Sequence, residues 1–244
     1  QINSLNATDV ADLTATQVAA MATTQVKALT ATVIGDMTET QVAAFTATQI
    51  ASLATGNVAG LAETQAAALT AGQVAAFTAS QIKELSETNL SALNATQVAA
   101  ITATQIKALT NTQVEALTAA DVAEFTAAQL ASLTTSQVAA LNATNMASLN
   151  ATQVASFTAT QVASLGTEAV KGLDATQMGA LTATQVKALT ATQIGALDAT
   201  DVGEITTAQI GALTKTQVSS LSQTSLAGLT ATQVGTFSTT QVQA

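Results

Sequence analysis

The stretch Leu181-Thr-Ala-Thr-Gln-Val-Lys-Ala-Leu-Thr-Ala-Thr-Gln-Ile-Gly-Ala-Leu197 contains two consecutive copies of an eight-residue unit. Each unit begins with a large apolar residue, continues with Thr-Ala-Thr-Gln and carries Val or Ile at its sixth position. The large apolar residue recurs every eighth residue from Leu5 to Phe237, which makes 30 units in a chain of 244 residues. We therefore expect residues 1–244 to be one continuous array of about thirty octapeptide repeats, part of a longer array.

One unit carries a complete signal for the start of a helix. Thr182 fits an N-cap, whose side-chain oxygen accepts from a backbone N–H two or three residues later. Gln185 then lies at the third helical position, where its side chain can reach back to the N-cap N–H and close a capping box. Leu181 and Val186 occupy the positions of a hydrophobic staple around this start. The unit therefore predicts a short helix that begins after Thr182.

Variation among the units supports a capping role for the second position. It is Ser, Thr, Asn or Asp in 26 of the 30 units; the exceptions are Ala22, Ala54, Ala62 and Gly166. A Thr selected for strand propensity would alternate with Val or Ile instead. The expected N-caps include Thr14, Thr30, Thr46, Thr102, Thr182 and Thr190. The expected capping-box glutamines include Gln17, Gln49, Gln105, Gln185 and Gln193. The expected core rows include Leu13, Val18, Leu29, Phe45, Val98, Leu181, Val186 and Leu189.

These patterns favour an all-α fold, a solenoid of two-turn helices with one helix per repeat. The alternative is a β-solenoid, because Thr-Ala-Thr resembles the Thr-x-Thr rows of some β-helices. Strict alternation would place Leu181 and Val186 on opposite faces, however, and the unit has no regular turn residue. A single helix would be roughly 360 Å long at about 1.5 Å per residue, and its apolar residues would drift around its surface. The five Phe residues are separated by multiples of 16, which suggests a structural repeat of two helices.

Composition excludes several classes of function. The net charge is −9, and the chain has no Cys, His, Trp, Tyr, Pro or Arg. Nucleophilic triads need a base, and the chain has no His or Cys, so we expect no enzyme, no catalytic residue and no cofactor. Six Lys residues are too few to favour nucleic acid. No apolar run is long enough for a membrane span.

Two further motifs have simple explanations in the repeat. Carboxylates recur three residues apart in Asp9/Asp12, Asp121/Glu124 and Asp201/Glu204; they could bind a cation weakly, but helix-dipole stabilisation explains them more simply, and we expect no metal. Five segments match the glycosylation sequence Asn-X-Ser/Thr, beginning at Asn6, Asn89, Asn94, Asn142 and Asn150. Four of these are the repeat itself with Asn as the N-cap.

The unit Leu181–Ala188, repeated through the whole chain, resembles the octapeptide (Leu-Thr-x-x-Gln-Val/Ile-x-Ala) repeat regions of very large bacterial secreted or surface adhesin-like proteins. This resemblance implies an exported, extended structural segment at the cell surface or outside the cell. It transfers no catalytic residue to this chain.

Two functions are compatible with the sequence. The first is a structural one, a rigid repeat segment of an extracellular filament, stalk or adhesin spacer. Its ends carry no polar capping repeat, so we expect self-assembly into a homo-oligomer or filament. The alternative is a surface-binding repeat protein that contacts ice, mineral or polysaccharide through ranked Thr side chains.

Overall fold

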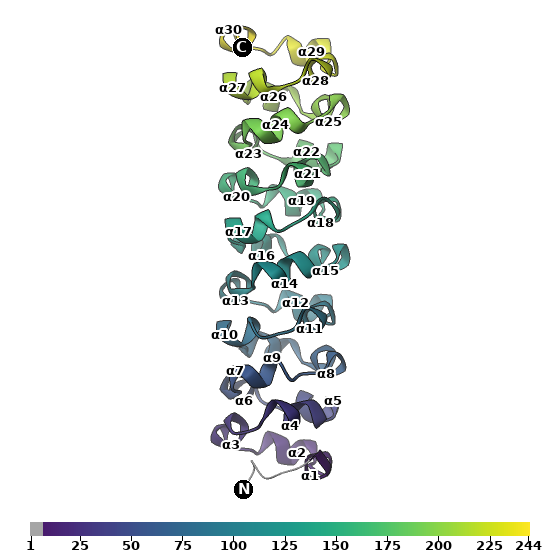
Figure 1. The fold of residues 1–244 in the computed structure, drawn as a ribbon, viewed down its shortest axis with the longest axis vertical. Coiled ribbons are helices and arrows are strands. Elements are labelled where there is room, and N and C mark those ends of the chain that lie inside the picture. The colour runs from purple at the N-terminus through teal and green to yellow at the C-terminus, as the bar shows by residue number, and fades with distance from the viewer. Residues whose placement is uncertain (1–6) are drawn as a thin grey trace. The chain divides into compact units, whose positions relative to one another are not determined.

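A computed structural model describes residues 7–244, which belong to two compact units divided between Leu117 and Thr118. All regular structure in residues 7–244 is helical and none of it is strand (Figure 1). The predicted all-α solenoid of short helices is therefore confirmed, and the β-solenoid alternative is not supported. Leu5 and Asn6, with which the first unit of the sequence pattern begins, lie outside the described residues.

Each unit is a succession of short helices, one for each octapeptide. The first unit contains α1 Ala7–Ala11, α2 Ala15–Ala19, α3 Thr23–Lys27, α4 Ala31–Asp36, α5 Glu39–Ala43, α6 Ala47–Ser52, α7 Thr55–Val58, α8 Glu63–Ala68, α9 Ala71–Ala76, α10 Ala79–Ile82, α11 Glu87–Ser91, α12 Ala95–Ala99, α13 Ala103–Ala108 and α14 Asn111–Ala116. The second contains α15 Ala119–Ala123, α16 Ala127–Ser132, α17 Thr135–Ala139, α18 Ala143–Ala147, α19 Ala151–Ala155, α20 Ala159–Ser164, α21 Thr167–Lys171, α22 Ala175–Ala180, α23 Ala183–Ala188, α24 Ala191–Ala196, α25 Ala199–Glu204, α26 Thr207–Ala212, α27 Lys215–Ser220, α28 Gln223–Ala227, α29 Ala231–Val234 and α30 Thr239–Val242.

The helices end without any special backbone conformation. They contain 4 to 6 residues, which is between one and two turns, because the first two residues of each octapeptide are extended. After α23, for example, Leu189 has φ −54° and ψ 139°, and the next N-cap, Thr190, has φ −71° and ψ 157°. No residue between 7 and 244 has a positive φ. The break every eight residues therefore needs no Gly; it comes from the next N-cap, which starts a new helix.

Stacking of these helices makes a superhelix within each unit. Within each unit, helices three places apart in the chain pack on each other, as α5 packs on α8 and α20 on α23 (Figure 1). Where the fifth position of a helix is Gln, its side chain also donates hydrogen bonds to carbonyls at the end of the helix four places earlier, as from α5 to α1 and from α20 to α16. One superhelical turn thus holds between three and four helices. The repeat of two helices suggested by the Phe spacing is wrong, because the contacts recur at every third helix.

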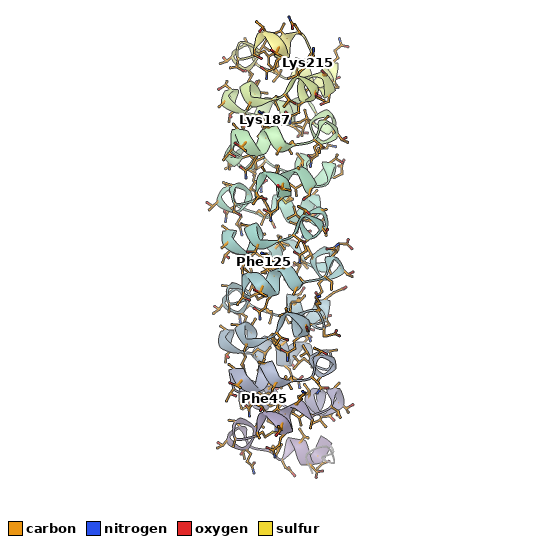
Figure 2. The ribbon with its side chains drawn as sticks, turned by 90° about the vertical axis from the view of Figure 1, so that its left-hand side faces the viewer. Phe45, Phe125, Lys187 and Lys215 are labelled. Atoms are coloured by element: carbon orange, nitrogen blue, oxygen red, sulfur yellow. The ribbon has the colours of Figure 1, made fainter. Side chains whose placement is uncertain are left out.

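The core of each unit lies inside its superhelix and is formed by the first and sixth positions of the octapeptides. Val186 and Leu181 are 0 % and 4 % exposed, and Phe45 and Phe125 are also buried. Lys187, at the seventh position, is exposed. Figure 2 marks where Phe45, Phe125 and Lys187 lie along the chain. Burying a Val, Leu or Phe side chain contributes about 1.5–3 kcal/mol. A helix of one to two turns is unstable alone in water, so this burial is what makes each helix persist.

Small residues at the seventh and eighth positions allow the helices to approach closely. The eighth position of one helix lies against the third position of the helix three places earlier. A Cβ atom added to Gly60 would be 2.5 Å from the carbonyl oxygen of Ala31. Gly172 lies in the same way against Ala143, at 3.1 Å. Gly60 and Gly172 therefore serve the close stacking of helices rather than the turns between them.

Candidate functional site

The glutamine at the fifth position joins its own helix to the turn before it. In α23, Gln185 Oε1 accepts a hydrogen bond from the backbone N–H of Thr182 at 2.6 Å, and the Gln185 N–H donates to Thr182 Oγ1 at 3.2 Å. These two bonds are the capping box. Gln185 Nε2 then donates to the carbonyl oxygens of Ala155 and Phe157, at 3.1 and 2.5 Å. One side chain thus closes a helix start and ties two turns together.

The same pattern repeats along both units, and we call it the glutamine ladder. Gln49 Nε2 donates to the carbonyls of Val18, Ala19 and Met21, which lie 31, 30 and 28 residues earlier. The ladder members with bonds of this kind in the first unit are Gln41, Gln49, Gln65, Gln73, Gln81, Gln97, Gln105 and Gln113. Those in the second unit are Gln153, Gln161, Gln177, Gln185, Gln193, Gln209, Gln217, Gln233 and Gln241.

Burial increases the contribution of these hydrogen bonds to stability. The ladder side chains are at most 6 % exposed, so water cannot replace the partners of the amide. A hydrogen bond contributes about 1 kcal/mol net, but a buried group that loses its partner costs about 1–3 kcal/mol. The carbonyl of the first-position residue depends most on this bond, because it lies beyond the end of its helix and has no hydrogen-bond partner within the helix. The ladder is therefore a specific tie between turns, not only a helix cap.

Shorter side chains at the fifth position keep part of this role. Asn89 Nδ2 donates only to the Leu61 carbonyl, at 2.9 Å, and Ser225 Oγ donates to the Leu197 carbonyl at 2.7 Å. Both retain the bond to the first-position carbonyl, 28 residues earlier. Asp201 retains only the capping half, because its carboxylate accepts from the Asp198 N–H at 2.8 Å and has no proton to donate. Ala169 and Val33 have no polar side-chain atom and make neither bond.

The residues expected to cap helices lie at helix starts. Thr14, Thr46, Thr102, Thr182 and Thr190 are N-caps that form capping boxes with Gln17, Gln49, Gln105, Gln185 and Gln193. Thr30 caps α4 by accepting from the Val33 N–H at 3.2 Å, without a box. Ala22 and Ala62 supply no side-chain oxygen, so only the glutamine half of the box is present there. The chain therefore tolerates the loss of either half.

The residues expected in the core rows are buried, with one exception. The buried set is Val18, Leu29, Phe45, Val98, Leu181, Val186 and Leu189, none more than 5 % exposed. Leu13 is only half-buried, and Gln17 in the helix that follows it is exposed. Both belong to the first turn of the first unit, which has no earlier turn beneath it among the described residues.

The role of the ladder between turns was missed by the sequence argument, although a signal for it exists. A capping box accepts Glu as readily as Gln. The fifth position is nevertheless Gln in 21 of 30 units and Glu in none. A position that selects for a carbonyl oxygen alone would admit Glu. The strong preference for Gln over carboxylates, which occur there only as Asp9, Asp121 and Asp201, indicates that the amide NH₂ is also used. Its acceptors could not be located without knowing the number of helices in a turn.

Charged groups form no comparable arrangement. Burial raises the pKa of Glu124, and the nearby Asp121 carboxylate raises it further. Burial also raises the pKa of Glu204, with contributions from Asp201, Asp174 and Asp198. Within residues 7–244, no group of three or more His, Cys, Asp or Glu side chains could hold a metal ion. None of the helices in that range is long and apolar enough to cross a membrane.

A comparison of the chain with protein-family models gave no match, and neither did a comparison with curated proteins.

Proposed function

We propose that this chain is a structural protein, a rigid repeat segment of an extracellular filament, stalk or adhesin spacer that assembles with further copies of itself. The observation that carries the proposal is the glutamine ladder. Each ladder side chain bonds to its own helix start and to two or three carbonyls of the preceding turn. A turn can tilt away from its neighbour only by breaking buried hydrogen bonds, so each unit resists bending and stretching.

The location of the polar groups supports the same proposal. The buried polar side chains among the described residues are the Gln, Asn and Ser of the fifth position, and their hydrogen bonds link turns. Stability in such an array is roughly a sum over neighbouring repeats, so adding units lengthens the segment without changing its construction. The proposed extracellular location is inferred from the resemblance to adhesin-like repeat regions.

Far-ultraviolet circular dichroism followed by negative-stain microscopy of the same sample tests this proposal. We expect a helical spectrum and straight particles that join into filaments. A variant with Gln185→Ala and Gln193→Ala keeps the apolar rows but cuts two ties, and its particles should bend more. Gln17→Ala with Gln25→Ala is the matched control, because these two exposed residues cap helices without lying over an earlier turn. Compact monomers that never associate would contradict the proposal.

A second candidate function has one specific observation in its favour. In the first unit, exposed Thr residues at the fourth position lie on five helices that stack in order, α2, α5, α8, α11 and α14. They are Thr16, Thr40, Thr64, Thr88 and Thr112. The other two such rows of this unit are interrupted by Gly72 and Gly56. This unbroken Thr row is the arrangement that binding to a periodic surface such as ice, mineral or polysaccharide requires.

Adsorption measurements distinguish the two candidates. If the Thr row binds ice, the chain should show thermal hysteresis at micromolar concentration, and Thr64→Lys should abolish it. Thr48→Lys, in a row that Gly72 interrupts, is the control and should have little effect. Equal activity of both variants, or no hysteresis and no retention on mineral or polysaccharide, would exclude surface binding through this row.

A further inference from the structure

Three asparagines of the Asn-X-Ser/Thr segments combine capping with a free amide nitrogen. Asn94, Asn142 and Asn150 are exposed N-caps of α12, α18 and α19. In each, Oδ1 accepts the backbone N–H three residues later, at 3.1, 2.9 and 3.0 Å. The cap uses the oxygen only, so Nδ2 has no role in holding the helix.

The fourth segment, Asn89-Leu-Ser91, has the opposite arrangement. Asn89 occupies the fifth position of its repeat and is 2 % exposed. Its Nδ2 donates to the Leu61 carbonyl at 2.9 Å, inside the contact between two turns. Because the side chain is buried, a sugar attached to this nitrogen would have to separate the two turns. Among the described residues, the same sequence motif thus occurs once with a buried asparagine and three times with an exposed one.

We propose that Asn94, Asn142 and Asn150 accept N-linked sugar in the folded chain and that Asn89 does not. The sugar donor is a hexose activated as a diphosphate ester. In the transfer, Nδ2 forms a bond to the anomeric carbon while the bond from that carbon to the diphosphate oxygen breaks. The diphosphate leaves, and a base of the transferase takes one proton from Nδ2. The product keeps Oδ1 as an acceptor, so the helix cap survives the modification.

The surroundings of these residues leave room for a sugar. The third residue of each segment, Thr96, Thr144 or Thr152, is exposed beside its Asn. Asn150 also lies at an open groove of about 520 Å³ lined by Phe125–Ala127 and Asn150–Gln153. A sugar on Asn150 would lie along this groove without displacing a core side chain.

The inference rests on the proposed extracellular function, since sugars of this type belong to exported chains. Its first test does not depend on export. The purified folded chain is incubated with a soluble glycosyltransferase that recognises Asn-X-Ser/Thr and with a nucleoside-diphosphate hexose, and sites are mapped by peptide mass spectrometry. We expect hexose on Asn94, Asn142 and Asn150 and none on Asn89.

The tryptic peptide 84–107 is the matched control, because it contains both Asn89 and Asn94 outside the fold. Both should be modified in the free peptide, whereas only Asn94 should be modified in the folded chain. Asn94→Asp, Asn142→Asp and Asn150→Asp remove the acceptor nitrogen but keep a capping oxygen, as at Asp174 and Asp198. Each should lose one hexose while the helical spectrum stays unchanged. Modification of folded Asn89 at the rate of Asn94, or unmodified Asn94, Asn142 and Asn150, would overturn the proposal.

The second test uses the chain isolated from the cells that make it. Sugar on the three exposed asparagines is the expected result, and a chain without any sugar there would also overturn the proposal. Filament formation is recorded on the same material by microscopy. Unmodified chains that still form filaments would leave the proposed structural function intact, so the two failures are distinguishable.

Discussion

Helices α21 and α23 lie in the same unit and bury the same apolar residue, but they differ in their polar contacts. Both bury the sixth-position valine, Val170 or Val186, to 0 % exposure. In α23, Thr182 and Gln185 supply the full capping box and the tie to the preceding turn. In α21, Gly166 provides no side-chain cap, and the fifth position is Ala169.

The difference between α21 and α23 separates the contribution of apolar burial from that of side-chain hydrogen bonds. Apolar burial is enough to hold α21 in place, because its helix forms without a cap or a tie. The ion pair between Lys171 and Glu168, at 3.5 Å, adds little at an exposed site. What α21 lacks is resistance to local opening, since its start has no side-chain hydrogen bond to break. We therefore expect amide exchange to be faster in α21 than in α23.

The largest effect should come from placing a charge in the ladder. Gln185→Glu preserves the shape and the capping oxygen, but directs a carboxylate at the carbonyls of Ala155 and Phe157. An uncompensated buried charge costs about 3–5 kcal/mol, and we expect a loss near the lower end at neutral pH. The introduced carboxyl donates only when protonated, so its pKa should be raised in the folded state. The variant should therefore be most stable at a pH below the pKa that the carboxyl has in the unfolded chain. It should lose this stability as the pH rises through the higher pKa that the carboxyl has in the folded chain.

Local amide exchange in α23, measured at pH 4 and pH 7, checks this expectation. Gln17→Glu is the control: Gln17 is exposed and serves only the capping box of α2, so this change should be nearly neutral. Equal losses at the two sites would mean that the inter-turn bonds of the ladder contribute nothing.

The sequence predicted the part of this comparison that depends on neighbouring residues. Helix, cap and box are encoded within four residues, from Thr182 to Gln185, and the two apolar rows follow directly from the period. The bonds from Gln185 to Ala155 and Phe157 depend on the number of helices in a turn. That number depends on how closely helices of successive turns approach, as at Gly60 and Ala31, and such contacts are not local in the sequence. Reading such packing from a single octapeptide was not possible.

Restoring the missing tie in α21 should have the next largest effect. Ala169→Gln introduces an amide that can reach the carbonyls of Val138 and Leu141, 31 and 28 residues earlier, which are the positions that Gln161 and Gln193 reach. We expect a gain of about 1 kcal/mol, the usual net value of a hydrogen bond to a buried acceptor. Slower amide exchange in α21 is the measurement. If exchange is unchanged, the glutamine side chain does not reach these carbonyls. The difference in exchange between α21 and α23 is then due to the missing N-cap alone.

The cap itself is tested at Thr182. Thr182→Val removes the oxygen that accepts from the Gln185 N–H and should cost about 1 kcal/mol. Thr182→Asp should cost little, because Asp174 and Asp198 already cap helices in this unit. The damage should remain near α23, since stability in a repeat array is roughly a sum over neighbours. Thermal unfolding together with local amide exchange measures both the size and the spread of the effect. A Val variant as stable as the parent would show that the ladder alone fixes the helix start.

The smallest effect should come from relieving a single partly buried carboxylate. Burial raises the pKa of Glu204, and Asp201, Asp174 and Asp198 add to the shift. A raised folded pKa means that Glu204 stabilises the fold below its unfolded pKa and that this contribution is lost as pH rises through the folded pKa. Glu204→Gln should therefore stabilise the chain at neutral pH, by less than about 0.5 kcal/mol, and should have no benefit at acidic pH. Denaturant titrations at pH 4 and pH 7 measure this difference, with exposed Glu115→Gln as the control. A gain as large as that of Ala169→Gln would contradict our ranking, because it would place repulsion between carboxylates on the same scale as the ties of the ladder.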